Sequence, residues 1–164
     1  MDRFLQSIGI ESAFNPVNMA TGANDGDWIN LAMYGRVVCV LFKGIGTAGQ
    51  DPVFTLKQAT DIAGAGAKAL NFTTIYAKVG TLTGVATFTR ITQAEAATYT
   101  DAVSAEAAAI FAVEIAAEDL DVNNGFTCIQ MSVPSVGAGA QLGCGFYIML
   151  SPRYVGSVAP DAKV

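Results

Sequence analysis

Short runs in which apolar and polar residues alternate dominate this chain, and turn-forming Gly, Asn, Asp and Pro separate them. The clearest run is 109–116, where Phe111, Val113 and Ile115 share one face of a strand. Residues 36–43 are instead apolar on both faces, which predicts a central strand covered on both sides. The pattern predicts strands at 14–20, 27–33, 36–43, 52–59, 71–79, 85–91, 109–116, 126–133 and 142–150.

These spacings predict an all-β fold, an antiparallel β-sandwich of jelly-roll type, with under a fifth of the residues in helix. The sandwich is placed at 14–150, and residues 1–13 and 151–164 are interpreted as extended N- and C-terminal arms. Alanine and glutamate at 104–120 favour helix. That alternative stays open beside a helical turn near 93–97 or 104–108 that is followed by a strand. Asn124-Gly125 predicts a tight hairpin turn.

The composition is poor in charge. Only 14% of the residues are charged, against about 25% in an ordinary soluble domain, while 52% are hydrophobic and the mean hydropathy is +0.41. The longest uncharged run, 122–152, is interrupted by Asn, Pro and Gly, so we expect no membrane span. Few charges remain to cover the surface of a monomer. We therefore expect a homo-oligomer, most simply a trimer.

The same composition argues against several kinds of chemistry. The chain has no histidine, which removes imidazole-based acid–base catalysis and histidine metal sites. Its nine Lys and Arg are scattered, so no basic patch for nucleic acid is expected. Cys39, Cys128 and Cys144 each lie in an apolar run and are predicted to be buried, reduced thiols. We therefore expect neither an enzyme, a cofactor nor a metal.

Two motifs have ordinary explanations. Residues 44–49 spell G-x-G-x-x-G, but Pro52 and a strand pattern follow instead of the helix that a dinucleotide site requires, which indicates a loop. Residues 119–125 are acidic, yet Asn124 and Gln130 occupy the positions where a calcium loop needs Gly and Glu. The tyrosines and Trp28 are assigned to core and interface packing rather than to a sugar-binding face.

Four stretches of the chain carry a resemblance to a known family. Residues 21–31 (TGANDGDWINL), 34–37 (YGRV), 48–59 (AGQDPVFTLKQA) and 118–126 (EDLDVNNGF) together resemble small structural proteins encoded beside the major capsid protein of tailed bacteriophages. The resemblance implies a head decoration, or cement, protein: a β-sandwich, often trimeric, made in the host cytoplasm and bound to the outer capsid surface of the virion. It brings no catalytic residues.

The partners expected from this resemblance are the major capsid protein and further copies of the chain, with neither nucleic acid nor membrane. Apolar residues in the predicted arms are typical of segments that a neighbouring molecule orders. The candidate assembly contacts are Phe4, Leu5, Ile8, Ile10, Arg153 and Tyr154. A phage tail or baseplate component and a carbohydrate-binding jelly-roll module remain as alternative functions.

Overall fold

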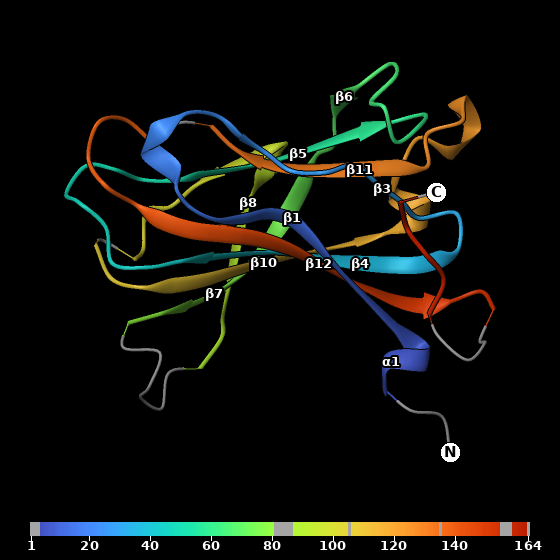
Figure 1. Ribbon diagram of the computed structural model, residues 1–164, viewed down its shortest axis with the longest axis horizontal. Helices are drawn as coiled ribbons and strands as arrows, with labels where there is room; N and C mark the ends of the chain where they lie inside the picture. The colour runs from blue at the N-terminus through green and yellow to red at the C-terminus, as the bar shows by residue number, and fades with distance from the viewer. Residues whose placement is uncertain (1–3, 81–86, 105, 135, 155–158, 164) are drawn as a thin grey trace.

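The computed structural model describes residues 4–80, 87–104, 106–134, 136–154 and 159–163. Strands make up 53% of the protein and helices 9%, which confirms the all-β class and the small helix content. Two antiparallel sheets pack face to face as a β-sandwich (Figure 1).

The longer strands are β1 (Ile8–Asn18), β4 (Tyr34–Lys43), β5 (Val53–Ala59), β7 (Phe72–Val79), β8 (Thr89–Ala96), β10 (Ala109–Ala116), β11 (Cys128–Val133) and β12 (Leu142–Pro152). The short ones are β2 (Asn24–Asp25), β3 (Ile29–Asn30), β6 (Lys68–Ala69) and β9 (Thr98–Thr100). The helical segments are α1 (Phe4–Ser7), η1 (Met19–Thr21), η2 (Ala117–Asp119) and η3 (Val122–Asn124).

The two sheets have different strand orders. The first, here called sheet A, runs β1-β12-β4-β10-β7-β8. The second, sheet B, runs β2-β11-β5-β6, with β3 also paired to β11 and β9 to β5. Strands that follow one another in sequence often lie in opposite sheets, so most of the pairing is between distant parts of the chain.

The core lies between the inner faces of the two sheets. On β10, Phe111, Val113 and Ile115 are buried, as the period-two pattern predicts. Sheet B contributes Leu56 from β5 and Met131 from β11, which are cross-strand partners and fully buried. β4 lies in the middle of sheet A, between β12 and β10, as its apolar character predicts.

The N-terminal boundary differs from the predicted one. β1 begins at Ile8, not at residue 14, and Ile8 to Ser12 pair with Leu150 to Phe146 on β12. Much of the predicted N-terminal arm is therefore part of sheet A. β1 is an edge strand, as Pro16 predicts, and its register shifts twice between Ser12 and Val17.

Several local expectations are wrong. The Asn124-Gly125 turn is not a hairpin, because β10 and β11, which it connects, lie in different sheets. Gly125 does adopt a left-handed conformation, with φ of 81°, and its N–H donates to Val122 O.

The bounds of three other predicted elements also differ. Residues 93–96 belong to β8 rather than to a helical turn. The strand expected at 27–33 is reduced to Ile29–Asn30. Of the strand expected at 85–91, residues 85 and 86 lie outside the described part of the chain.

The C-terminal segment folds back onto its own domain. Ala162 is 1% exposed and accepts a backbone hydrogen bond of 2.7 Å from Asn30 N–H. The buried Tyr34 hydroxyl donates to Pro160 O, and Lys163 Nζ lies 2.8 Å from Asp27 Oδ2. Residues 160–163 therefore cover one end of the sandwich, although the sequence pattern placed them in an outward-reaching arm.

A buried ion pair anchors the loop after β9. Lys43, at the end of β4, is fully buried, and its Nζ lies 2.9 Å from Asp101 Oδ2. Asp101 also accepts hydrogen bonds from the N–H groups of Val103 and Ser104 and from the Ser104 hydroxyl. A charged pair at this depth needs such additional hydrogen bonds to offset the loss of water.

Candidate assembly surface

The outer faces of the two sheets differ in chemistry. On sheet B, paired β5 and β11 direct the polar pairs Lys57–Gln130 and Thr55–Ser132 outward, although Gln130 and Ser132 are themselves buried. Sheet A presents mainly aliphatic and aromatic side chains outward from β1, β12 and β4. An antiparallel sheet that faces water normally has a polar outer side. Over β1, β12 and β4, sheet A therefore lacks the polar outer side of a sheet that faces water.

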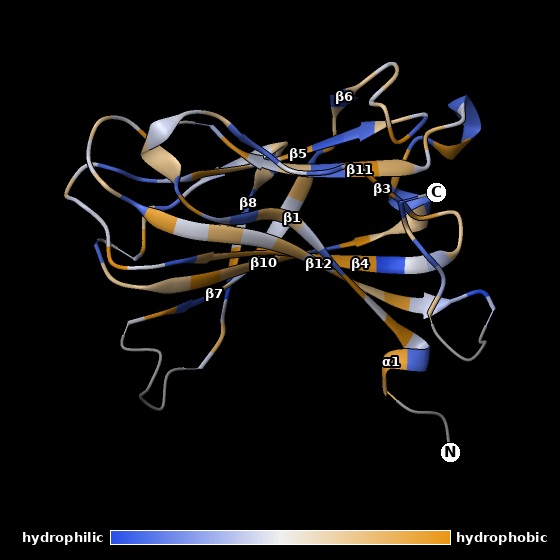
Figure 2. Cartoon of the chain, viewed as in Figure 1, coloured by the Kyte–Doolittle hydropathy of each residue, from blue (hydrophilic) through white to orange (hydrophobic). Residues whose placement is uncertain are grey.

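We call this surface the apolar face. Its members come from three adjacent strands and are all outward-pointing by register: Ile8, Ile10, Val38, Val40, Phe42, Cys144, Phe146, Ile148 and Leu150. Cross-strand pairs build it in rows, including Ile10 with Ile148 and Phe146 with Val40. Hydrophobic residues recur along β12 and β4 in Figure 2.

The predicted coverage of β4 on both sides does not hold in the single chain. Phe42 is 41% exposed and Ile10 is 54% exposed, whereas Val40, in the middle of the face, is buried by its neighbours. The apolar residues thus partly cover one another, and Ile10 and Phe42 form the exposed rim of the face. Within the described chain, nothing from the same molecule covers this rim.

A hollow lies at one end of the apolar face. Its volume is about 430 Å³, and its lining is Pro16, Val17, Asn18, Phe42, Gly44, Leu142, Gly143 and Cys144. The register shifts in β1 occur beside it. Leu142, on the rim of the hollow, is 60% exposed. An apolar side chain of a partner would fill a depression of this kind better than water does.

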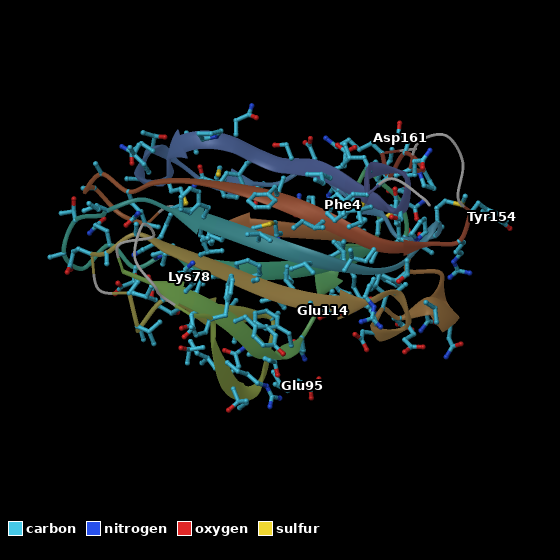
Figure 3. The ribbon with its side chains drawn as sticks, turned by 90° about the horizontal axis from the view of Figure 1, so that it is seen from below. Phe4, Lys78, Glu95, Glu114, Tyr154 and Asp161 are labelled. Atoms are coloured by element: carbon cyan, nitrogen blue, oxygen red, sulfur yellow. The ribbon has the colours of Figure 1, made fainter. Side chains whose placement is uncertain are left out.

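The predicted contact residues gather at the opposite end of the same sheet. Phe4 and Leu5, on α1, are 66% and 62% exposed, and α1 lies beside the end of β12 where Arg153 and Tyr154 follow (Figures 1 and 3). Ile8 and Ile10 continue from α1 along β1 into the apolar face. The structure thus places residues from both ends of the chain at the same end of sheet A.

Charged residues border the apolar face on one side. Figure 3 looks onto the outer side of sheet A and shows Glu114, Lys78 and Glu95 on the β10–β7–β8 half. Arg36 Nη1 lies 2.7 Å from Glu114 Oε1, so the charge nearest to the apolar face is paired. The outer side of sheet A is therefore divided into an apolar half and a polar half.

The cysteines are free, and two of the three match the expectation of burial. Cys39 and Cys128 are buried, and desolvation raises the pKa of both thiols. Cys144 is only half-buried, because it points outward from β12 opposite Phe42. Its expected burial is therefore wrong for the single chain. The position makes Cys144 a natural reporter for the apolar face.

The remaining motifs behave as ordinary structure. Residues 44–49 form a loop between β4 and β5, without a following helix. In the acidic segment, Asp121 is paired with Lys68 and accepts hydrogen bonds of 2.9 Å from Asn124.

Among the residues that the structure describes, no group of three or more Cys, Asp or Glu side chains is placed to hold a metal ion. No helix in that part of the chain is long and apolar enough to cross a membrane.

No protein-family model, curated protein or solved structure matches this chain.

Sequence reasoning missed the main part of the surface. Val38, Phe42, Phe146 and Ile148 lie in strands whose positions were predicted well. Cover on both sides was predicted only for residues 36–43, and the outer face of 142–150 was not assigned. The available signal was that two strands were apolar on both faces in a protein with few charges. Such a pattern does not distinguish cover by the same chain from cover by another copy.

Proposed function

We propose that this chain is a non-enzymatic structural protein that decorates and stabilises the outer surface of a tailed-phage capsid. The observation that carries the proposal is the apolar face of sheet A. Its exposed rim favours a protein that works inside an assembly, since large exposed apolar patches mark interfaces. Copies of this chain are the proposed occupants of the apolar face, and the major capsid protein is the proposed partner of the end that carries α1.

A jelly-roll interpretation of the sandwich supports this function. In a jelly roll, the first half of the chain pairs with the second half in reverse order, as one long hairpin that winds into two sheets. The pairs β1–β12, β3–β11, β4–β10 and β5–β9 follow that order, and β12–β4 and β11–β5 join them within the sheets. β7 and β8 then extend sheet A beyond β10. Jelly rolls are frequent in virion shells and in lectins.

Self-association is tested at the apolar face. We expect the wild-type chain to form a homo-oligomer, most simply a trimer, and Phe42→Glu to shift it to monomer, because a carboxylate there would be desolvated in the interface. The measurement is light scattering coupled to size-exclusion chromatography at micromolar concentration. Cys144 gives a second measurement, since thiol labelling should be slow in the oligomer and faster in the Phe42→Glu monomer.

The matched control for this experiment is Ile62→Glu. Ile62 is 43% exposed, close to the 41% of Phe42, but it lies in the loop before β6 and not on sheet A. This variant should keep the wild-type mass and the slow labelling of Cys144. A monomeric wild-type chain, or equal dissociation by both substitutions, would remove the apolar face from the proposal.

Capsid attachment is tested at the other end of sheet A. We expect the purified protein to co-sediment with capsids assembled from the major capsid protein of the same genome. The double substitution Phe4→Ser/Leu5→Ser should abolish this while leaving the oligomer intact, because both side chains are exposed and outside the core. Co-sedimentation with purified tails, but not with capsids, would support a tail component and contradict the decoration function.

A further inference from the structure

The polar half of sheet A contains a hollow of about 290 Å³. Side chains from four adjacent strands and from η2 line it: Arg36, Thr74, Tyr76, Arg90, Glu114, Ala116 and Asp119. It extends from Arg36 on β4 across β10 and β7 to β8, and it shares no residue with the apolar face. Its occupant is therefore a separate question from self-association.

Tyr76 is the aromatic residue of this hollow. It is 39% exposed, whereas Tyr34, Tyr99 and Tyr147 are buried in the core. Its neighbours across the sheet are Ala112 on β10 and Arg90 on β8. Ala112 has only a methyl group, so one side of the tyrosine ring has a small neighbour. A partly exposed ring in a polar hollow offers a flat apolar surface for stacking.

The charges around the ring are balanced. Arg36 is paired with Glu114 at 2.7 Å, and an Asp119 carboxylate oxygen accepts the Ala116 N–H at 2.8 Å. Arg90 Nη2 lies 3.4 Å from Thr74 Oγ1. Two guanidinium groups and two carboxylates thus line this hollow. A phosphate or sulfate would meet the carboxylates, and a cation would meet the guanidinium groups, so neither sign of charge is favoured.

We propose that this hollow binds a neutral saccharide, with a sugar ring stacked on Tyr76. Sugar hydroxyls both donate and accept hydrogen bonds, and they match the donors of Arg36 and Arg90 and the acceptors of Glu114 and Asp119. A ligand without charge leaves the Arg36–Glu114 pair intact and adds hydrogen bonds at its edge.

An adjoining hollow indicates the length of the ligand. It has a volume of about 380 Å³ and shares Thr74, Glu114 and Asp119 with the first. Asn71 and Glu95 also line it, and Asn71 Nδ2 lies 3.4 Å from Glu95 Oε1. The two hollows form one polar track along the end of β7. A track of this kind fits an oligosaccharide better than a single sugar.

The test is to titrate the wild-type protein with three neutral oligosaccharides, maltohexaose, cellohexaose and chitohexaose. Binding is monitored through the amide NMR signals of the protein. We expect at least one to bind with a millimolar dissociation constant and to shift amide signals of β7, β8 and β10. Tyr76→Ala should weaken that binding about tenfold or more, the loss expected when a stacking surface worth about 1.4 kcal/mol is removed.

Tyr154→Ala is the matched control, because Tyr154 is 70% exposed and lies outside both hollows. It should leave the affinity unchanged. Sodium sulfate in place of the sugars tests the anion alternative. The proposal is overturned if none of the three sugars binds, if sulfate alone shifts the same signals, or if both tyrosine variants lose affinity equally. Folding of each variant is checked by its unperturbed core amide signals.

Discussion

Replacing Asp101 with asparagine should lower the free energy of unfolding by about 3–5 kcal/mol, measured by urea denaturation at neutral pH. The substitution leaves the Lys43 ammonium group in the core without its carboxylate partner, whose oxygen lies 2.9 Å away in the native protein. Asparagine can still accept the N–H groups of Val103 and Ser104. The expected loss therefore reports mainly the buried charge of Lys43 without its carboxylate counter-charge.

Two further variants separate this effect from general disruption. Glu114→Gln breaks the Arg36–Glu114 pair, whose side chains are 52% and 44% exposed, and should change stability by only about 0–1 kcal/mol. The double variant Lys43→Met/Asp101→Asn removes both buried charges and should recover part of the loss. If Asp101→Asn costs no more than Glu114→Gln, the buried pair does not hold this end of β4.

The same pair gives a pH dependence with a defined sign. Burial opposes ionisation of Asp101, but hydrogen bonds from Ser104 and Lys43 outweigh it, so the pKa of this carboxyl is lowered. A lowered pKa in the folded state adds stability above the unfolded pKa of about 3.9. That stability is lost as the pH falls through the folded pKa. The difference between wild type and Asp101→Asn should therefore shrink in this acidic range.

The sequence pattern predicted strands well where one face is buried and the other is not. β10 occupies the predicted range of 109–116, and β5, β7 and β11 begin within two residues of their predicted starts. In β5 and β10 the side chains alternate between buried and more exposed positions, whereas all six residues of β11 are buried. The central position of β4 followed from the same reasoning. Local periodicity is thus sufficient for the strands that form the core.

The pattern could not predict pairings between distant residues. Lys43 has the inward orientation of Val37, Cys39 and Leu41 on β4, although a lysine normally faces water. Its burial depends on Asp101, which only the folded chain brings near it. The apolar face is a similar case, because Phe42 and Phe146 look like core residues in the sequence. Only the sheet order shows that their side of β4 and β12 is uncovered.

The ends of the chain depart most from the predicted organisation, and their different roles can be tested by truncation. A chain that ends at Ala159 should lose about 2–4 kcal/mol of unfolding free energy. It lacks Ala162, whose carbonyl accepts the Asn30 N–H, and Pro160, whose carbonyl accepts the buried Tyr34 hydroxyl. It also lacks Lys163, whose ammonium group lies between Asp27 and Glu11.

A chain that starts at Ile8 is the matched control for this truncation. It lacks α1, whose Phe4 and Leu5 are exposed, and keeps all of β1, so its stability should change by less than about 0.5 kcal/mol. Starting at residue 13 instead should be strongly destabilising, because it removes the pairing of Ile8 to Ser12 with β12. Thermal and urea unfolding of the three chains measure this order. If the chain that ends at Ala159 is as stable as wild type, the C-terminal segment is a free arm after all and remains available to a partner.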